Sequence, residues 1–233
     1  MIVAFAGSGS RFLKTLLSVN LAVLRARSGH KICLLDTDPR ESAYAWSCER
    51  RSARQWPSVA GRAPSGRVLA HEIKELGPQY ADLLINTGGH DSQGTLSALI
   101  AARIAVVPVT VNDVDVDRHY ALIVRLNSAR MFNPALKVLF VVVTDGATPA
   151  GGQLAAVRLY VAHVMSATLA ETVLHVHGER DDGRGRCVCD AETCDPEAAA
   201  ELHSLYREIY VHRVVPREGI FSISLTRTTE RPT

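Results

Sequence analysis

Residues 7–15 hold the side chains that are best suited to chemistry, because small and hydroxyl residues lead into Lys14 and Thr15. They follow an apolar run and precede a stretch with helical periodicity. At such a strand–loop–helix junction, backbone amides and the helix dipole attract an anion, a lysine adds a point charge, and a hydroxyl can ligate Mg²⁺. The segment therefore predicts a phosphate site. The motif G-x-x-x-x-G-K-[ST] is matched only at its end, because Ser8 and Leu13 stand at glycine positions.

The elements that must position this loop alternate along the chain. Short apolar runs are rich in Val, Ile and Leu and nearly continuous, as expected for strands buried on both faces. They lie at residues 2–6, 31–35, 82–85, 104–109, 136–143 and 172–176. Helical candidates lie at residues 14–28, 96–102, 116–130, 152–164 and 196–210. This alternation predicts the α/β class, with a mostly parallel twisted sheet and helices on both faces.

Composition is that of a globular protein. The 233 residues are 47% hydrophobic and 21% charged, which fits a single α/β domain over residues 1–212 and a loosely ordered tail at 213–233. The net charge of +2 does not by itself demand nucleic acid. No run approaches the ~20 apolar residues of a membrane span, and the start lacks a signal-peptide pattern. We therefore expect a cytoplasmic protein with reduced thiols and no membrane contact.

Two stretches interrupt the alternation. Residues 50–67 carry five arginines among Pro, Gly and Ser, and are interpreted as a basic loop whose charges are solvated, with a DNA-contacting patch as the alternative. Residues 178–195 are charged and contain Cys187, Cys189 and Cys194. Nearby histidines invite a zinc interpretation, but the spacing is not that of paired zinc knuckles, which favours free thiols.

Further blocks follow Lys14-Thr15 in a specific order. They are Leu17-Ser18-Val19-Asn20-Leu21-Ala22, Asp36-Thr37-Asp38-Pro39, Asn86-Thr87-Gly88-Gly89, Val107-Pro108-Val109, and a helical block from Asp195-Pro196 to Glu208. In this order and spacing the chain resembles the ParA/MinD (Soj-like) family of ATPases with a deviant Walker A motif. The resemblance covers roughly residues 1–210 and is strongest to plasmid partition ParA proteins.

The resemblance implies an ATP-dependent dimer that sandwiches two Mg-ATP, binds DNA non-specifically, and is stimulated by a ParB-type centromere-binding protein. Carried over to this sequence, Lys14 would contact the phosphates. Thr15 and Asp38 would lie at the Mg²⁺ ion. Asp36 and Asp38 would be the catalytic carboxylates beside the metal and the attacking water, although carboxylates at a strand end commonly cap the following turn.

Several cofactor-binding positions depart from the family pattern. Gly9 stands where the family lysine reaches the partner's nucleotide, Ser10, Arg11 and Leu13 replace glycines, Asn86 replaces the Walker B aspartate, and Thr144-Asp145 replace the adenine-reading pair. A leucine costs about 1–2 kcal/mol where the backbone is left-handed, and its side chain would fill space for phosphate oxygens. Asn86 removes a charge from the outer shell of the metal. Arg11 could supply part of the charge that is lost at Gly9.

These departures leave three functions open. The first is a ParA-like partition switch, a homodimer acting on DNA and a ParB-type partner. The second is a pseudo-ATPase that works as a binding or regulatory module and pairs with an intact ParA-like subunit. The third is a small-molecule enzyme of the wider superfamily, which no substrate motif supports.

Three smaller features bear on the choice between these functions. DNA contacts near the last helix would use Arg207, Arg213 and Arg217. His90 beside Asp91 is interpreted as structural rather than as a proton-transfer pair. Residues 221–228 alternate like a strand and offer no membrane-binding amphipathic helix.

Overall fold

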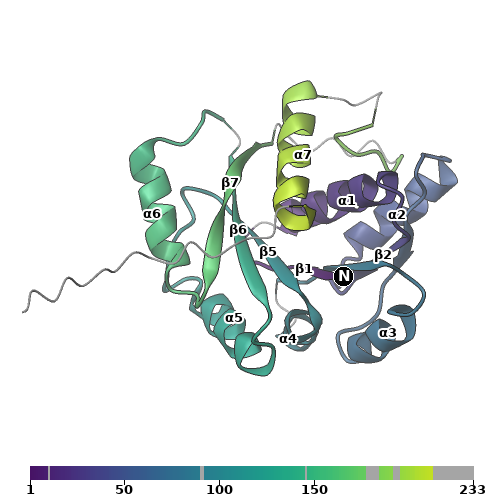
Figure 1. The fold of residues 1–233 in the computed structure, drawn as a ribbon, viewed down its shortest axis with the longest axis horizontal. Coiled ribbons are helices and arrows are strands. Elements are labelled where there is room, and N and C mark those ends of the chain that lie inside the picture. The colour runs from purple at the N-terminus through teal and green to yellow at the C-terminus, as the bar shows by residue number, and fades with distance from the viewer. Residues whose placement is uncertain (10, 90–91, 145, 177–183, 191–194, 212–233) are drawn as a thin grey trace, which may run out of the picture.

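The computed structural model describes residues 1–9, 11–89, 92–144, 146–176, 184–190 and 195–211. In these residues seven strands form one sheet in the order β3-β2-β4-β1-β5-β6-β7, and every neighbouring pair is parallel (Figure 1). The strands are β1 Ile2–Phe5, β2 Ile32–Asp36, β3 Ala60–Arg62, β4 Asp82–Asn86, β5 Ile104–Val109, β6 Lys137–Thr144 and β7 Ala167–His175. The predicted α/β class and parallel sheet are confirmed.

Helices cover both faces of the sheet (Figure 1). They are α1 Arg11–Arg27, α2 Ser42–Ser52, α3 Leu69–Leu76, α4 Ser92–Ala101, α5 Tyr120–Phe132, α6 Gly151–Val161 and α7 Pro196–Tyr210. One apolar cluster joins α1, α2 and α7 to the sheet, and a second joins α3, α4, α5 and α6 to the opposite face. Alternate residues of β1 explain the division, because Val3 and Phe5 enter the first cluster while Ala4 enters the second.

Strand β1 lies at the centre of the sheet, between β4 and β5. The chain moves from β1 outward to one side through β2 and β3, and later to the other side through β5, β6 and β7. The carboxyl end of β1 is therefore the point at which the strand order reverses. In open α/β sheets, ligands bind in the crevice at such a point. The loop after β1 occupies the position that a ligand site requires.

The interpretation of residues 50–67 as a solvated basic loop holds for the exposed side chains of Arg51, Arg54, Arg62 and Arg67 but is wrong for Arg50. Arg50 belongs to α2 and its side chain is fully buried, and β3 forms within the same stretch. Neither α2, β3 nor α3 was expected. A strand of three residues and a helix rich in polar side chains give weak periodicity, so packing on the sheet decides their structure. Arg50 is consequently removed from any DNA-contacting surface.

Residues 184–190 pack against α1 and α2, and the carboxylate of Asp190 makes several of the contacts. Asp190 accepts hydrogen bonds from Arg50 at 2.8 and 3.1 Å and from Arg27 at 2.6 Å, which ties this segment to α2 and α1. Cys187 is buried here, and burial raises the pKa of its thiol to about 12. No cluster of metal-ligating side chains occurs among the described residues, whereas Cys194 lies outside them. The described part of this segment therefore joins α1 to α2.

The last helix begins where the sequence places it. The Asp195 side chain accepts hydrogen bonds from the backbone of Glu197 and Ala198, and Pro196 occupies the first turn. Glu208 of α7 accepts hydrogen bonds from the backbone of Thr172 on β7, so the helix covers that strand. The predicted tail at 213–233 lies outside the described residues. No described helix has the length and apolar character needed to cross a membrane.

Candidate functional site

The loop after β1 leads directly into α1, as the sequence predicts, but the helix begins at Arg11 rather than at residue 14. The replacement of glycines by Arg11 and Leu13 explains the earlier start, because these residues favour helix far more than glycine does. The first four N–H groups of a helix have no partner within it. In this chain they belong to residues 11–14, so the amides that can hold an anion lie one turn before Thr15.

Lys14 points inward. Its side chain is 1% exposed, and Nζ donates a hydrogen bond of 3.0 Å to the carbonyl oxygen of Gly7. A Cβ atom added to Gly89 would lie 3.7 Å from this Nζ atom, so the loop after β4 also approaches it. Burial lowers the pKa of Lys14, the charge of Asp38 raises it, and Arg11 lowers it again. The chain thus keeps an ammonium group in a buried position beneath the loop.

Asp36 ends β2 and caps α2. Its Oδ2 atom accepts hydrogen bonds from the backbone of Ala43 at 2.7 Å and of Tyr44 at 3.1 Å. Its Oδ1 atom accepts from the backbone of Asp38 at 3.1 Å and from Asn86 at 3.0 Å. Burial raises the pKa of Asp36, and these four hydrogen bonds act in the opposite direction. Both carboxylate oxygens are therefore engaged in holding the start of α2 and the end of β4.

Asn86 ends β4 beside Asp36 and Thr15. Because a carboxylate can only accept, the amide nitrogen of Asn86 faces Asp36, and the same nitrogen lies 3.5 Å from Thr15 Oγ1. The amide oxygen Oδ1 is buried and has no hydrogen-bond partner among the described residues. A buried unpaired acceptor costs about 1–3 kcal/mol. This oxygen is suited to a donor that a bound group brings, such as a metal-coordinated water.

Asp38 and Arg11 face each other across the loop. Arg11 Nε lies 3.9 Å from Asp38 Oδ2, and Asp38 is buried while about a third of the Arg11 side chain is exposed. The backbone of Arg40 donates to the other oxygen of Asp38 at 3.0 Å. The structure thus gathers Arg11, Lys14, Thr15, Asp36, Asp38 and Asn86 at the carboxyl ends of β1, β2 and β4.

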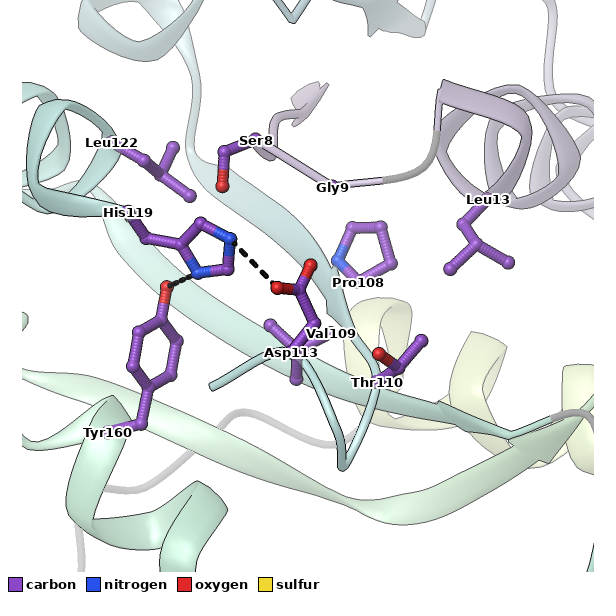
Figure 2. A pocket seen from close by; sticks show the side chains of 10 residues that line it. All are labelled: Ser8, Gly9, Leu13, Pro108, Val109, Thr110, Asp113, His119, Leu122 and Tyr160. Atoms are coloured by element: carbon purple, nitrogen blue, oxygen red, sulfur yellow. Dashed lines mark hydrogen bonds and ion pairs between the residues drawn. The ribbon is translucent and has the colours of Figure 1, made fainter. Parts of the chain in front are cut away.

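The structure corrects the expected backbone strain at Leu13 and adds a neighbour to Gly9. Leu13 lies in the first turn of α1, where the backbone is right-handed, so the expected strain does not arise. Its side chain belongs to the core cluster beneath α1 and also lines the small pocket beside the loop (Figure 2). Gly9 is exposed, and a Cβ atom added to it would lie 3.4 Å from Asp113 Oδ2. A carboxylate from the segment after β5 therefore stands beside the position of the family lysine.

A small pocket opens on that side of the loop (Figure 2). Its wall carries His119, whose Nδ1 atom lies 3.0 Å from the hydroxyl of Tyr160 and whose Nε2 atom lies 3.5 Å from Asp113 Oδ1. Burial and the charge of Asp113 raise the pKa of Tyr160 to about 12. The tyrosine hydroxyl therefore stays protonated beside the imidazole of His119.

Sequence reasoning missed this cluster. Asp113, His119 and Tyr160 come from the segment after β5, the start of α5 and the end of α6, and no spacing rule links them. The block Val107-Pro108-Val109 marks the strand that leads to them, which was the available signal. Of the other candidates, Thr144 ends β6 on the same edge of the sheet. Ser10, His90, Asp91 and Asp145 lie outside the described residues, as do Arg213 and Arg217.

Three solved structures of other proteins illustrate the shared fold. A plasmid partition protein from Borrelia burgdorferi has a TM-score of 0.61 at 14% identity, covering 89% of this chain and 96% of that one. MinD cell division protein from Aquifex aeolicus has a TM-score of 0.62 at 14% identity, with coverages of 92% and 98%. Cobyrinic acid a,c-diamide synthase from Mycobacterium smegmatis, with bound ATP analog and magnesium, has a TM-score of 0.61 at 15% identity, with coverages of 90% and 95%.

These identities establish a shared fold. No curated protein sequence matches the chain significantly. The family model for the CobQ/CobB/MinD/ParA nucleotide binding domain matches residues 3–158, which is more than half of the chain and includes the loop after β1, Asp36, Asp38 and Asn86. The chain belongs to the CobQ/CobB/MinD/ParA nucleotide binding domain family.

Proposed function

We propose that this chain binds Mg-ATP at the loop between β1 and α1 and acts as a nucleotide-controlled switch in DNA partition. The observation that carries the binding proposal is the buried, unpaired Oδ1 atom of Asn86, whose Nδ2 atom lies 3.5 Å from Thr15 Oγ1, together with the buried amine of Lys14. A site without a ligand would gain stability from apolar residues at these positions. The presence of polar side chains at these positions instead supports a bound anion and its metal ion.

Each side chain then has a stated task. Lys14 and the first-turn amides of α1 hold the phosphates, and Thr15 ligates Mg²⁺. Asn86 and Asp38 orient water in the outer shell of the metal. Asp36 positions Asn86 and the start of α2. When bound, Mg-ATP supplies the divalent charge and the phosphoanhydride. Arg11 places positive charge close to where phosphate would lie, in partial replacement of the lysine absent at Gly9.

The partition role rests on likeness to the plasmid partition protein and on the family, which also includes MinD. In this proposal nucleotide favours a dimer, and the dimer combines basic residues of two copies into a face for non-specific DNA. Arg207 is exposed on α7 and is a candidate for that face. A ParB-type protein would be the partner that resets the switch.

A second candidate is a pseudo-ATPase that pairs with an intact ParA-like subunit. The specific observation in its favour is the combination of Gly9, which lacks the cross-subunit lysine, with Asn86, which lacks the Walker B charge. Such a subunit would bind nucleotide without efficient turnover. An active partner would supply the missing lysine.

Sedimentation velocity with Mg-ATP, Mg-ADP and no nucleotide tests the switch. We expect a dimer with Mg-ATP alone, duplex DNA binding only by that dimer, and loss of both in Lys14→Ala. Arg11→Ala serves as the second variant and should weaken ATP binding while leaving the fold intact. A monomer under all conditions that also fails to bind DNA would contradict the partition switch. Dimerisation only after addition of an intact ParA-like protein would favour the pseudo-ATPase.

A further inference from the structure

Trp56 stands out among the exposed side chains. It is 73% exposed in the connection between α2 and β3, whereas Trp46, the other tryptophan, is buried and donates its indole N–H to the carbonyl of Arg186 at 2.9 Å. A single exposed apolar side chain is ordinary on a protein surface. The unusual feature of Trp56 is how firmly its backbone is held.

Arg50 anchors three consecutive residues. Its carbonyl accepts a hydrogen bond of 2.9 Å from the backbone of Gln55, and its guanidinium donates to the carbonyls of Trp56 at 2.9 Å and Pro57 at 2.8 Å. This guanidinium is fully buried and is held in turn by Asp190 at 2.8 Å. A buried ion pair thus fixes the segment that presents the indole to solvent. A platform fixed in advance loses little conformational entropy when a ligand stacks on it.

Two arginines precede Trp56 closely in the sequence. Arg51 and Arg54 are exposed in the turn that ends α2, where the backbone of Arg54 donates to the carbonyl of Arg51 at 3.1 Å.

We infer that Trp56, with Arg51 and Arg54, forms a stacking site for single-stranded nucleic acid. Unstacked bases offer a flat face to an aromatic ring, and their phosphates pair with nearby arginines. A protein partner would favour an anchor among other apolar side chains. The other exposed large apolar side chains of the described residues lie mainly on α4, α5 and α6 and around them, whereas the exposed residues next to Trp56 in the sequence, Ser52, Ala53 and Ser58, are small.

The proposed surface is separate from the nucleotide site. Asp36 holds the first turn of α2 at the carboxyl edge of the sheet, whereas Arg51 is near the other end of that helix. With 11 residues, α2 spans about 16 Å. Binding of single strands should therefore not depend on Lys14, and its success or failure can be told apart from that of nucleotide binding.

The test uses Trp46→Phe, which leaves Trp56 as the sole tryptophan, excited selectively at the red edge of its absorption. A 15-nucleotide oligothymidylate is titrated into the full chain at low salt without ATP, and binding is followed by quenching of Trp56 and, independently, by anisotropy of a labelled strand. We expect Trp56→Ala to weaken binding about 5- to 100-fold and Trp56→Phe to retain most of it. Arg54→Ala should weaken binding and flatten its salt dependence. Phe132→Ala, which removes a side chain that is 70% exposed on α5, is the matched control and should bind like the parent.

Four results would overturn the inference. One is equal affinity of Trp56→Ala and its parent in the anisotropy assay. Another is equal competition by duplex DNA of the same charge, since stacked bases cannot reach the ring. The third is equal competition by poly-glutamate, which would assign the surface to an acidic protein. Unchanged single-strand binding by Lys14→Ala is expected, and loss of binding in that variant would place the strand at the nucleotide site instead.

Discussion

Asn86 Nδ2 donates a hydrogen bond of 3.0 Å to Asp36 Oδ1, which leaves the Oδ1 atom of Asn86 buried without a partner among the described residues. This relationship links the cap of α2 to the end of β4 and to Thr15. An aspartate at position 86 could not make the same contact in its charged form. The hydrogen bonds of the site therefore require an amide at position 86, and substitution of this residue tests that requirement.

Asn86→Asp should lower the Tm of the protein in the absence of metal and enlarge the rise in Tm that Mg-ATP produces. Two carboxylates in hydrogen-bond contact cannot both ionise without cost, so the pair would retain a proton at neutral pH. Added Mg²⁺ with ATP would relieve the repulsion. Thermal unfolding should show a lower Tm for the variant alone and a larger upward shift with Mg-ATP. A variant with the parent's Tm and no larger shift would mean that residue 86 lies away from the metal.

Lys14→Met should stabilise the ligand-free protein by about 1 kcal/mol, because it removes a buried charge and keeps an unbranched side chain. Burial lowers the pKa of Lys14 below its ordinary value of 10.5. Below the lowered pKa the ammonium is charged in both states and its burial costs stability in full. As pH rises from the lowered pKa toward 10.5, the folded state loses its proton first and the cost disappears.

The stability advantage of Lys14→Met should therefore be largest below the lowered pKa of Lys14 and shrink as the pH rises toward 10.5. Urea unfolding at several pH values measures it, with Lys74→Met on α3 as the control for removal of a lysine charge. A variant less stable than the parent at neutral pH would show that Lys14 is a structural residue.

Asp190→Ala should destabilise the fold by about 3 kcal/mol, since it leaves the buried Arg50 guanidinium without its carboxylate. Burial acts to raise the pKa of Asp190, but hydrogen bonds from Arg50 and the Cys187 backbone outweigh it and lower the pKa. The contribution is thus present above the ordinary pKa of 3.8 and lost as pH falls through the lowered value. Urea unfolding should show the difference between parent and variant at pH 7 narrowing in strong acid, and a constant difference would contradict this origin.

Asp113→Asn should tighten the binding of Mg-ATP about 2- to 5-fold at low salt, because Asp113 places a negative charge beside Gly9 and the phosphate loop. The gain should fade at high ionic strength, as expected for a partly exposed charge. Asp117→Asn, an exposed carboxylate further along the same segment, is the matched control. Fluorescent nucleotide titrations at two salt concentrations measure both. Weaker binding in Asp113→Asn would show that this carboxylate helps to hold the ligand.

The sheet could be predicted because its strands are buried on both faces and leave nearly continuous apolar runs. The start of α7 could be predicted from Asp195-Pro196, whose effects on helix geometry are local. The helix α2 escaped prediction because its packing rests on the buried Arg50, whose partner Asp190 is 140 residues away. The early start of α1 was also missed, since the family pattern extends the loop to Lys14.

The site residues likewise comprise some that the sequence predicts and some that depend on tertiary packing. Lys14, Thr15, Asp36 and Asn86 follow strands or begin a helix, so their meeting at one edge follows from the parallel topology. The contact of Gly9 with Asp113, and of His119 with Tyr160, depends on how α5 and α6 pack. Such contacts arise from tertiary packing between elements that sequence patterns treat separately.

The most direct test of the account is calorimetric titration of Mg-ATP into the purified protein and into Lys14→Ala. The account predicts measurable binding by the parent, with at least a tenfold loss in the variant, and a matching rise in Tm for the parent alone. Equal binding by both proteins, or no binding by either, would contradict the claim that the loop after β1 holds a nucleotide against α1.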